Sequence, residues 1–194
     1  MIIRKAKVED SESITSLLML ATGEVMYRFI GESNYSKAYD FLRHFVESEN
    51  NQYSFQNCYV IEDGGEIQGA LLAYDGAKLH ELREPVMEYI HQHFDPNLIV
   101  EEETQAGEYY IDSIGVLPTQ QGKGIGATLL NYVIREQVFE NGRTLGLLVD
   151  KTNPRAKRLY QKLGFESVGE KNLMGISLEH LQLKGSIGNK SMAI

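Results

Sequence analysis

A glycine-rich turn between an apolar strand and an apolar helix constrains this chain more than any other feature. The segment from Tyr109 to Leu117 is rich in Tyr, Ile and Val and predicts a β-strand. Apolar residues then recur at helical spacing, at Leu129, Leu130, Val133, Ile134 and Val138. The turn between them consists of Gln121, Gly122, Lys123, Gly124, Ile125 and Gly126. A strand, a turn and a helix in this order direct unpaired N–H groups and the positive end of the helix dipole at one point, which suits an anion such as a pyrophosphate.

The glycines of this turn leave more than one nucleotide-binding class open. A side chain at Gly124 or Gly126 would keep a phosphate away from the backbone, and glycine permits positive φ angles. The Walker pattern fails, because Gly122-Lys123 is followed by glycine and Leu117 stands where its first glycine belongs. The dinucleotide fingerprint G-x-G-x-x-G is met at its first two glycines, and it sometimes allows the Ala127 found at its third. Spacing alone therefore does not exclude a dinucleotide.

A second segment, residues 145–165, supplies another strand and another helix. Its apolar start, Leu145 to Val149, predicts the strand. Asn153 is a good helix N-cap, Pro154 suits the first helical position, and Gly164 suits the helix end. Local helix physics alone accounts for all three residues.

Together the two segments resemble the GNAT superfamily of N-acetyltransferases. Gln121 to Gly126 matches the family's Gln/Arg-x-x-Gly-x-Gly/Ala motif, and Tyr110 to Pro118 looks like its fourth strand. Asn153 to Phe165 resembles the family's Asn-x-x-Ala-x-x-x-Tyr-x-x-x-Gly-Phe segment position by position. The resemblance implies an α/β fold with a mixed, mostly antiparallel sheet that is splayed between its fourth and fifth strands and has helices on both faces. It also implies acetyl-CoA as co-substrate, with its pyrophosphate at residues 121–126.

The resemblance further implies roles for single residues. The main-chain groups that would bind the pantetheine arm are those of Ile114, Gly115 and Val116. One of their N–H groups would face the thioester carbonyl and stabilise the oxyanion. Tyr160 would protonate or hydrogen-bond the departing thiolate, although simple packing against its leucine neighbours is the alternative. Asn153 would touch coenzyme A in addition to capping its helix.

The general base is open between two carboxylates. A lysine-like amine with a pKa near 10.4 is neutral in only about one molecule in a thousand at pH 7, so its proton must be removed before attack. Asp112 and Glu108 lie on the strand that approaches the site. A water relay, or a surface or capping role for Asp112, remains the alternative.

These residues predict direct transfer of an acetyl group to a primary amine of a small molecule or peptide in a ternary complex. A non-catalytic acyl-CoA sensor or scaffold of the same fold is the alternative, and the presence of Tyr160 favours the enzyme. A dinucleotide-dependent oxidoreductase would need an acidic residue about 20 positions after the loop, at the end of a second strand. Glu140 is near that distance but lies in a helix-to-strand connection.

The remaining chain predicts one domain, residues 1–183, with a mobile tail at 184–194. Ile2 to Lys7 predicts a first strand and Asp10 caps the helix that follows. A second helix is expected from Ser36 to Glu47, and both helices should pack on one face of the sheet. A β-hairpin is expected around the turn Asp63-Gly64-Gly65.

An insertion is expected at residues 76–107, between the third and fourth strands. It should hold a helix from Pro85 to Phe94 and a solvated acidic run, Glu101 to Glu103, whose functional alternative is a rim that attracts cationic substrates. No metal site is expected, because His91 and His93 point to different sides of a helix. The acceptor specificity should lie in this insertion and in residues 20–57.

Composition narrows the partners. The 194 residues carry 19 Lys and Arg against 27 Asp and Glu, a net charge of −8, which opposes a nucleic-acid footprint and mildly favours a cationic substrate. The sequence shows neither a signal peptide nor a membrane span, so we expect a cytoplasmic protein. Its one cysteine, Cys58, is expected to be buried. Oligomeric state is open, although homodimers are common in the family that it resembles.

Overall fold

A computed structural model describes residues 1–185, and the predicted tail lies almost wholly outside this range. Its helices and strands follow one another as β1 (Ile2–Lys5), α1 (Ser11–Ile30), α2 (Tyr35–Glu47), β2 (Cys58–Asp63), β3 (Glu66–Asp75), α3 (Leu79–His93), β4 (Tyr109–Val116), α4 (Ile125–Ile134), β5 (Leu145–Asp150), α5 (Pro154–Lys162), β6 (Glu166–Leu173) and β7 (Ile176–Leu183). Short 3-10 turns precede α1, β2, α3 and α4, and a π-helical turn, Arg135–Glu140, extends α4. The expected order of elements is confirmed.

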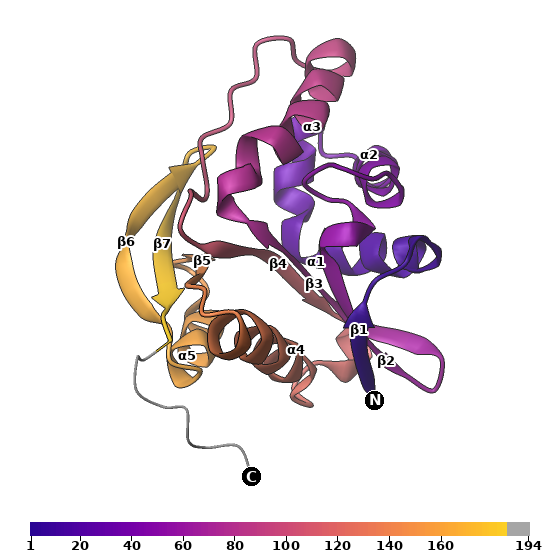
Figure 1. The fold of residues 1–194 in the computed structure, drawn as a ribbon. Helices are drawn as coiled ribbons and strands as arrows, with labels where there is room; N and C mark the ends of the chain where they lie inside the picture. The colour runs from indigo at the N-terminus through magenta and orange to yellow at the C-terminus, as the bar shows by residue number, and fades with distance from the viewer. Residues whose placement is uncertain (186–194) are drawn as a thin grey trace.

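Within the described residues the strands form one seven-stranded sheet in the order β1-β2-β3-β4-β5-β7-β6. Every neighbouring pair is antiparallel except β4 and β5. Helices α1, α2 and α3 cover one face of the sheet, and α4 and α5 cover the other (Figure 1). Side chains alternate along a strand, so β3 contributes to a core on each face of the sheet. Ala70 and Leu72 pack in the core beneath α1, α2 and α3, and Leu71 and Ala73 pack in the core beneath α4 and α5. The predicted mixed sheet with helices on both faces is confirmed.

The parallel contact between β4 and β5 is short. It joins Tyr109, Tyr110 and Ile111 to Leu145, Gly146 and Leu147, and then it ends. Across the other edge of β4, Ser113 pairs with Leu72 and Ile111 with Ala73, so Asp112 is an extra residue in a β-bulge. A bulge bends its strand and increases the local twist. The predicted splay between the fourth and fifth strands therefore begins where this bulge turns β4 away.

Helix α1 crosses β4 very closely beyond the bulge. A Cβ atom placed on Gly115 would lie 2.1 Å from the carbonyl oxygen of Leu17. Since that neighbour is backbone, it cannot rotate away. The glycine at position 115 is therefore explained by packing of α1, whatever its main chain binds.

Several local expectations were wrong. The first strand ends at Lys5, and the Asp10 side chain does not cap α1; it binds Arg4 at 2.7 and 2.9 Å and accepts the Lys7 N–H at 2.8 Å. Helix α3 begins at Leu79 and contains Pro85 in its interior. Burial of Leu79 and Leu82 against Tyr74 and Tyr110 extends that helix in front of the proline.

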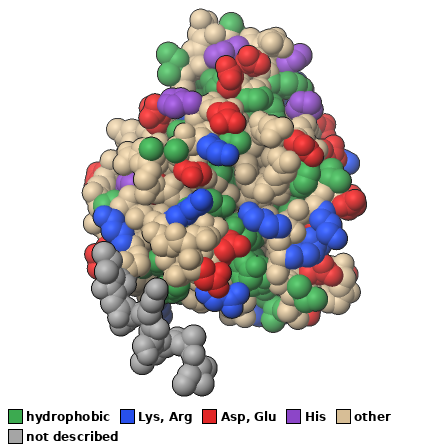
Figure 2. Space-filling view, in the orientation of Figure 1, with side chains coloured by type: hydrophobic (Ala, Val, Ile, Leu, Met, Phe, Trp, Pro, Cys, Tyr) green, Lys and Arg blue, Asp and Glu red, His purple; other side chains and the backbone are tan. Residues whose placement is uncertain are grey.

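The insertion packs against the domain more closely than its composition indicated. Glu103 is only 4% exposed, so the expected solvated loop is wrong at this residue, whereas Glu101 and Glu102 are exposed. Cys58 is fully buried, as expected. On the face shown in Figure 2, acidic and basic side chains are interspersed, and histidines gather at the end of the molecule where α3 lies.

We predict that Gly115→Ala destabilises the protein by about 1–3 kcal/mol or more, because its methyl group would overlap the backbone of α1. Gly126→Ala is the matched control, since its Cβ would meet nothing closer than 3.7 Å in the first turn of α4. The control should keep or gain stability, by up to about 1 kcal/mol. Urea denaturation of both variants measures the difference, and equal stabilities would contradict the close crossing.

Candidate functional site

The glycine-rich loop presents bare backbone at the start of α4. Gly122 and Gly124 have φ angles of +79° and +85°, in the left-handed region, and Gly124 is the N-cap of the helix. The first N–H groups of a helix have no intrahelical acceptor, so those after Gly124 are free to meet an anion. The neighbouring side chains bind within the loop: Gln121 Nε2 donates to the Val116 carbonyl at 3.3 Å, and Lys123 Nζ to Gln120 Oε1 at 3.1 Å.

The edge of β4 that faces β5 has main-chain groups without a strand partner beyond the bulge. The Leu117 N–H donates to the Gln68 carbonyl at 3.0 Å, towards β3. Because successive N–H groups of a strand point to opposite edges, those of Val116 and Ile114 point towards the opening, and that of Gly115 points towards β3. Of the three predicted pantetheine-binding residues, two therefore offer donors to the opening.

Helix α5 and its N-cap carry the last predicted cofactor-binding residue, Asn153, and the predicted catalytic residue Tyr160. Asn153 is its N-cap, with the side-chain oxygen accepting the Ala156 N–H at 3.1 Å, and Pro154 takes the first helical position, as expected. Tyr160 is 9% exposed and its ring meets that of Phe165 at 5.9 Å. Burial raises the pKa of Tyr160 to about 12, so its hydroxyl keeps its proton at neutral pH and can donate a hydrogen bond.

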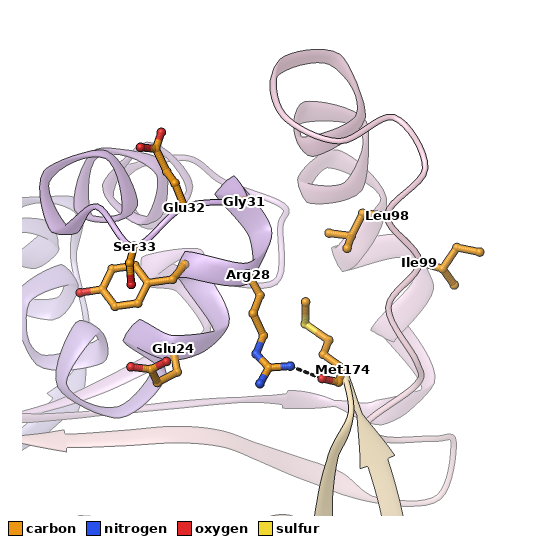
Figure 3. Close-up of a pocket in the computed structure, with 9 residues that line it drawn as sticks. Glu24, Arg28, Gly31, Glu32, Ser33, Leu98, Ile99 and Met174 are labelled. Carbon is orange, nitrogen blue, oxygen red and sulfur yellow. Dashed lines mark hydrogen bonds between the residues drawn. The ribbon is translucent and has the colours of Figure 1, made fainter.

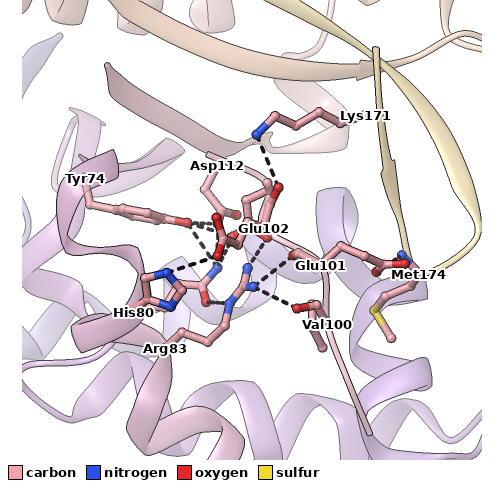
Figure 4. Close-up of polar contacts among 11 residues, drawn as sticks. Tyr74, His80, Arg83, Val100, Glu101, Glu102, Asp112, Lys171 and Met174 are labelled. Atoms are coloured by element: carbon pink, nitrogen blue, oxygen red, sulfur yellow. Dashed lines mark hydrogen bonds and ion pairs between the residues drawn. The ribbon is translucent and has the colours of Figure 1, made fainter. Parts of the chain in front are cut away.

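Asp112 lies in a network of polar side chains, most of them buried (Figure 4). Its Oδ2 accepts hydrogen bonds from Gln52 Nε2 and from the Tyr74 hydroxyl, both at 3.0 Å. The same two groups contact Glu103 Oε1, at 2.6 and 2.9 Å. Glu103 also forms an ion pair with Arg83, which donates to the Glu101 carbonyl at 2.9 Å. The Asp112 and Glu103 carboxylates therefore share two hydrogen-bond donors. The Arg83 guanidinium forms an ion pair with Glu103 only.

This environment favours the protonated form of Asp112. Burial raises the pKa of its carboxyl, the Glu103 charge raises it further, and hydrogen bonds from Gln52 and Tyr74 together with the Arg83 charge oppose the rise. The result is a pKa of about 6. A carboxylate poised near neutral pH suits a general base.

Glu108 has a different environment. Its carboxylate is 3% exposed and binds Thr104 at 2.7 Å, His180 at 2.8 Å and Gln182 at 2.8 Å. Burial alone would raise the pKa of Glu108, but hydrogen bonds from His180, Thr104 and Gln182 outweigh it and leave the pKa below its ordinary value. The carboxylate also lies against Gly146, where an added Cβ would come within 2.0 Å of it. Glu108 therefore links the start of β4, β7 and the insertion, and of the two candidates Asp112 has the environment that better suits a base.

Three members of this site, Gln52, Tyr74 and Arg83, were not expected from the sequence, and Glu103 was expected only as part of an acidic run. Gln52 and Tyr74 are separated from Asp112 by 60 and 38 positions. Arg83 and Glu103 belong to the insertion. No local spacing connects these residues, because only the fold brings them together.

Two adjoining hollows lead away from the opening. The inner cavity, of about 130 Å³, is lined by Asp112 and Tyr110 on β4 and by Leu148 on β5, so it lies where the two strands separate. An outer groove of about 580 Å³ lies between α1, residues 98–99 of the insertion and the β6–β7 turn (Figure 3). Met174 lines both. Its carbonyl accepts a hydrogen bond from Arg28, and its N–H donates to Glu101 at 2.8 Å.

Within residues 1–185, no group of three His, Cys, Asp or Glu residues is arranged to hold a metal ion. None of the helices there has the length and hydropathy of a membrane span.

Comparison with known proteins identifies the family. A model of the acetyltransferase (GNAT) family matches residues 24–165, which is more than half of the chain. The chain belongs to the GNAT family. GNAT members are acetyl-CoA-dependent N-acetyltransferases, so membership implies acetyl-CoA as co-substrate and an amine as acceptor, without defining that amine.

Individual relatives agree with this assignment. A solved acetyltransferase structure is 30% identical, covers 95% of this chain and 99% of its own, and has a TM-score of 0.77. An N-acetyltransferase from Staphylococcus aureus Mu50 is 23% identical over 94% of this chain and 100% of its own, with a TM-score of 0.82, and supports the fold. The N-alpha-acetyltransferase RimI of Mycobacterium tuberculosis is 40% identical over 62 residues, which span 32% of this chain and 37% of RimI.

We predict that Gly124→Val abolishes acetyl-CoA binding in calorimetry, because a branched side chain would stand where the phosphates approach. Gly142→Val is the matched control. Both positions have a positive φ, +85° and +68°, and space around an added Cβ, so both substitutions should strain the backbone by about 1–2 kcal/mol. Equal acetyl-CoA affinities in the two folded variants would contradict binding of the pyrophosphate at this loop.

We also predict that Asp112→Asn becomes more stable relative to wild type as pH rises from 4 to 7. The pKa of Asp112 is raised from 3.8 to about 6 on folding, so its contribution to stability is present below pH 3.8 and is lost as pH rises through 6. Asparagine does not titrate and loses nothing over this range. Thermal denaturation at several pH values measures the difference, which would stay constant if Asp112 had an ordinary pKa.

Proposed function

We propose that this GNAT protein transfers the acetyl group of acetyl-CoA directly to a primary amine of a small molecule or peptide, in a ternary complex. One observation carries the proposal: the opening between β4 and β5 has free main-chain donors on one side and a carboxylate with a pKa of about 6 beside it. In this proposal the pyrophosphate lies at residues 121–126 and the pantetheine arm along Ile114 and Val116. Asn153 contacts coenzyme A from the start of α5.

Each step of the reaction has a group in this arrangement. Asp112 takes a proton from the ammonium group, and the neutral nitrogen attacks the thioester carbonyl carbon. The N–H of Ile114 or Val116 stabilises the oxyanion that forms. As the C–S bond breaks, the thiolate takes the proton of Tyr160, and Tyr160 regains one through solvent from the new amide nitrogen. No covalent bond to the enzyme forms.

The proposal includes a cytoplasmic homodimer. The burial of its one cysteine suits a reducing compartment. Strand β6 is an edge strand with mostly exposed side chains, which a second copy could cover. Size-exclusion chromatography with light scattering tests the mass of the assembly.

The proposed function is tested by release of coenzyme A thiol in the presence of amines, amino acids, polyamines, aminoglycosides and peptide amino termini. Release that depends on one class of amine, with the acetylated product found by mass spectrometry, is the expected result. Binding of acetyl-CoA without transfer to any amine would leave a non-catalytic module instead.

We predict that Tyr160→Phe slows turnover by about 10- to 100-fold, because a thiol is already a fair leaving group and loses only its acid. Acetyl-CoA affinity should change little, since the ring still packs against Phe165. Steady-state kinetics and calorimetry on the same variant separate the two effects. Turnover equal to that of the wild type would mean that water or another residue donates the proton.

A further inference from the structure

The inner cavity offers an acceptor two acidic groups and no basic one. Its polar lining residues are Thr22, Gln52, Tyr53, Glu103, Tyr110 and Asp112. The other lining side chains are apolar and come from α1, residue 100 of the insertion, β5, β6, the β6–β7 turn and β7. No Lys, Arg or His of the described chain lines the cavity. Arg83 reaches Glu103 from outside this lining, so the three charges sum to −1 when both carboxylates are ionised.

The size of the cavity limits what can enter. An apolar cavity of about 150 Å³ holds benzene, which has six carbon atoms. At about 130 Å³, this cavity holds roughly five heavy atoms. An amine nitrogen and about four carbons of an unbranched chain fill it, and the remainder of a longer molecule continues past Met174 into the outer groove.

A carboxylate beside the amine would be opposed in this cavity. It would lose water on entering, and it would lie against Asp112 and Glu103 without a cation to bind. The carboxylate group would also have to displace apolar side chains that line the cavity. An ammonium group on a methylene chain meets neither obstacle.

We propose that the acceptor is an unbranched primary alkylamine without a carboxylate on the carbon that bears the amine, and that α-amino acids are excluded. This inference rests on the proposed function and deepens it. Free polyamines and lysine side chains of peptides share this chemistry, so the experiment distinguishes them.

The test compares three acceptors that share one unbranched five-carbon chain: pentylamine, norleucine and norleucinamide. Norleucine is pentylamine with a carboxylate on the amine-bearing carbon, and norleucinamide replaces that charge by a neutral amide. We expect kcat/KM for norleucine to be at least about 100-fold below that for pentylamine. Norleucinamide should fall between them, because only the charge has been removed.

Chain length gives a second readout. From ethylamine to butylamine, kcat/KM should rise by about fourfold per methylene as each one enters the apolar part of the cavity. Beyond about four carbons the rise should level off, since the added atoms reach the open groove. 1,4-Diaminobutane represents a free polyamine, and Nα-acetyl-lysine amide represents a lysine side chain of a peptide. The one with the higher kcat/KM identifies which of the two is the acceptor.

The Glu103→Gln variant tests whether the charge of the inner cavity causes the preference for pentylamine over norleucine. It removes one charge and keeps a side chain that can still bind Arg83, so the ratio of pentylamine to norleucine should fall at least about tenfold. The ratio is internal to each variant, so loss of folded protein does not affect it. Similar kcat/KM for norleucine and pentylamine in the wild type would overturn the inference while leaving N-acetyl transfer intact. Failure of every amine, with acetyl-CoA still bound, would overturn both.

Discussion

The short parallel contact between β4 and β5 is the constraint on which the rest of the site depends. Two strands that stayed paired would bind each other's main chain and leave nothing for a cofactor. Here the bulge at Asp112 ends the pairing after three residue pairs and turns the next N–H groups towards the opening. The same residue that bends the strand also supplies the carboxylate beside the opening. In the proposed function, backbone geometry and acid–base chemistry therefore come from one position.

Two polar clusters on the same face of the sheet hold this arrangement. At the narrow end of the opening, Glu108 joins β4 to β7 through His180 and Gln182 across the bare backbone of Gly146. On the face covered by α1, α2 and α3, the pair of Arg83 and Glu103 reaches in from the insertion. Buried charges are costly to desolvate, and breaking such a pair costs about 3–5 kcal/mol. The insertion therefore lines the proposed acceptor site, and replacing it by another loop would change the charge that Asp112 meets.

The sequence predicted those parts of the protein whose causes are local. Three features follow from a few neighbouring residues each: the Asp63-Gly64-Gly65 turn, the Asn153 cap and the positive φ of Gly124. The cofactor loop follows from the order of a strand, a glycine-rich turn and a helix. The prediction for Asp10 was wrong because its carboxylate binds Arg4 and the Lys7 N–H just before the helix. The prediction for Pro85 was wrong because tertiary burial of Leu79 and Leu82 extends the helix in front of it. Glu103 belonged to an acidic run typical of solvated loops, and its burial depends on Arg83, twenty positions earlier. The acceptor side of the site could not be predicted, because Gln52, Tyr74 and Asp112 meet only after the sheet has formed.

The β6–β7 turn gives the two hollows different mechanical properties. Met174 has a φ of +49°, and its main chain is held by Arg28 on α1 and by Glu101 of the insertion. Both bonds are exposed to solvent, so water can replace them at a net cost of about 1 kcal/mol each. The inner cavity, by contrast, is walled in part by buried residues, among them Phe29, Tyr53 and Tyr110. The groove can therefore widen around molecules of different bulk at little cost, while in the proposed function the inner cavity selects the group that reacts.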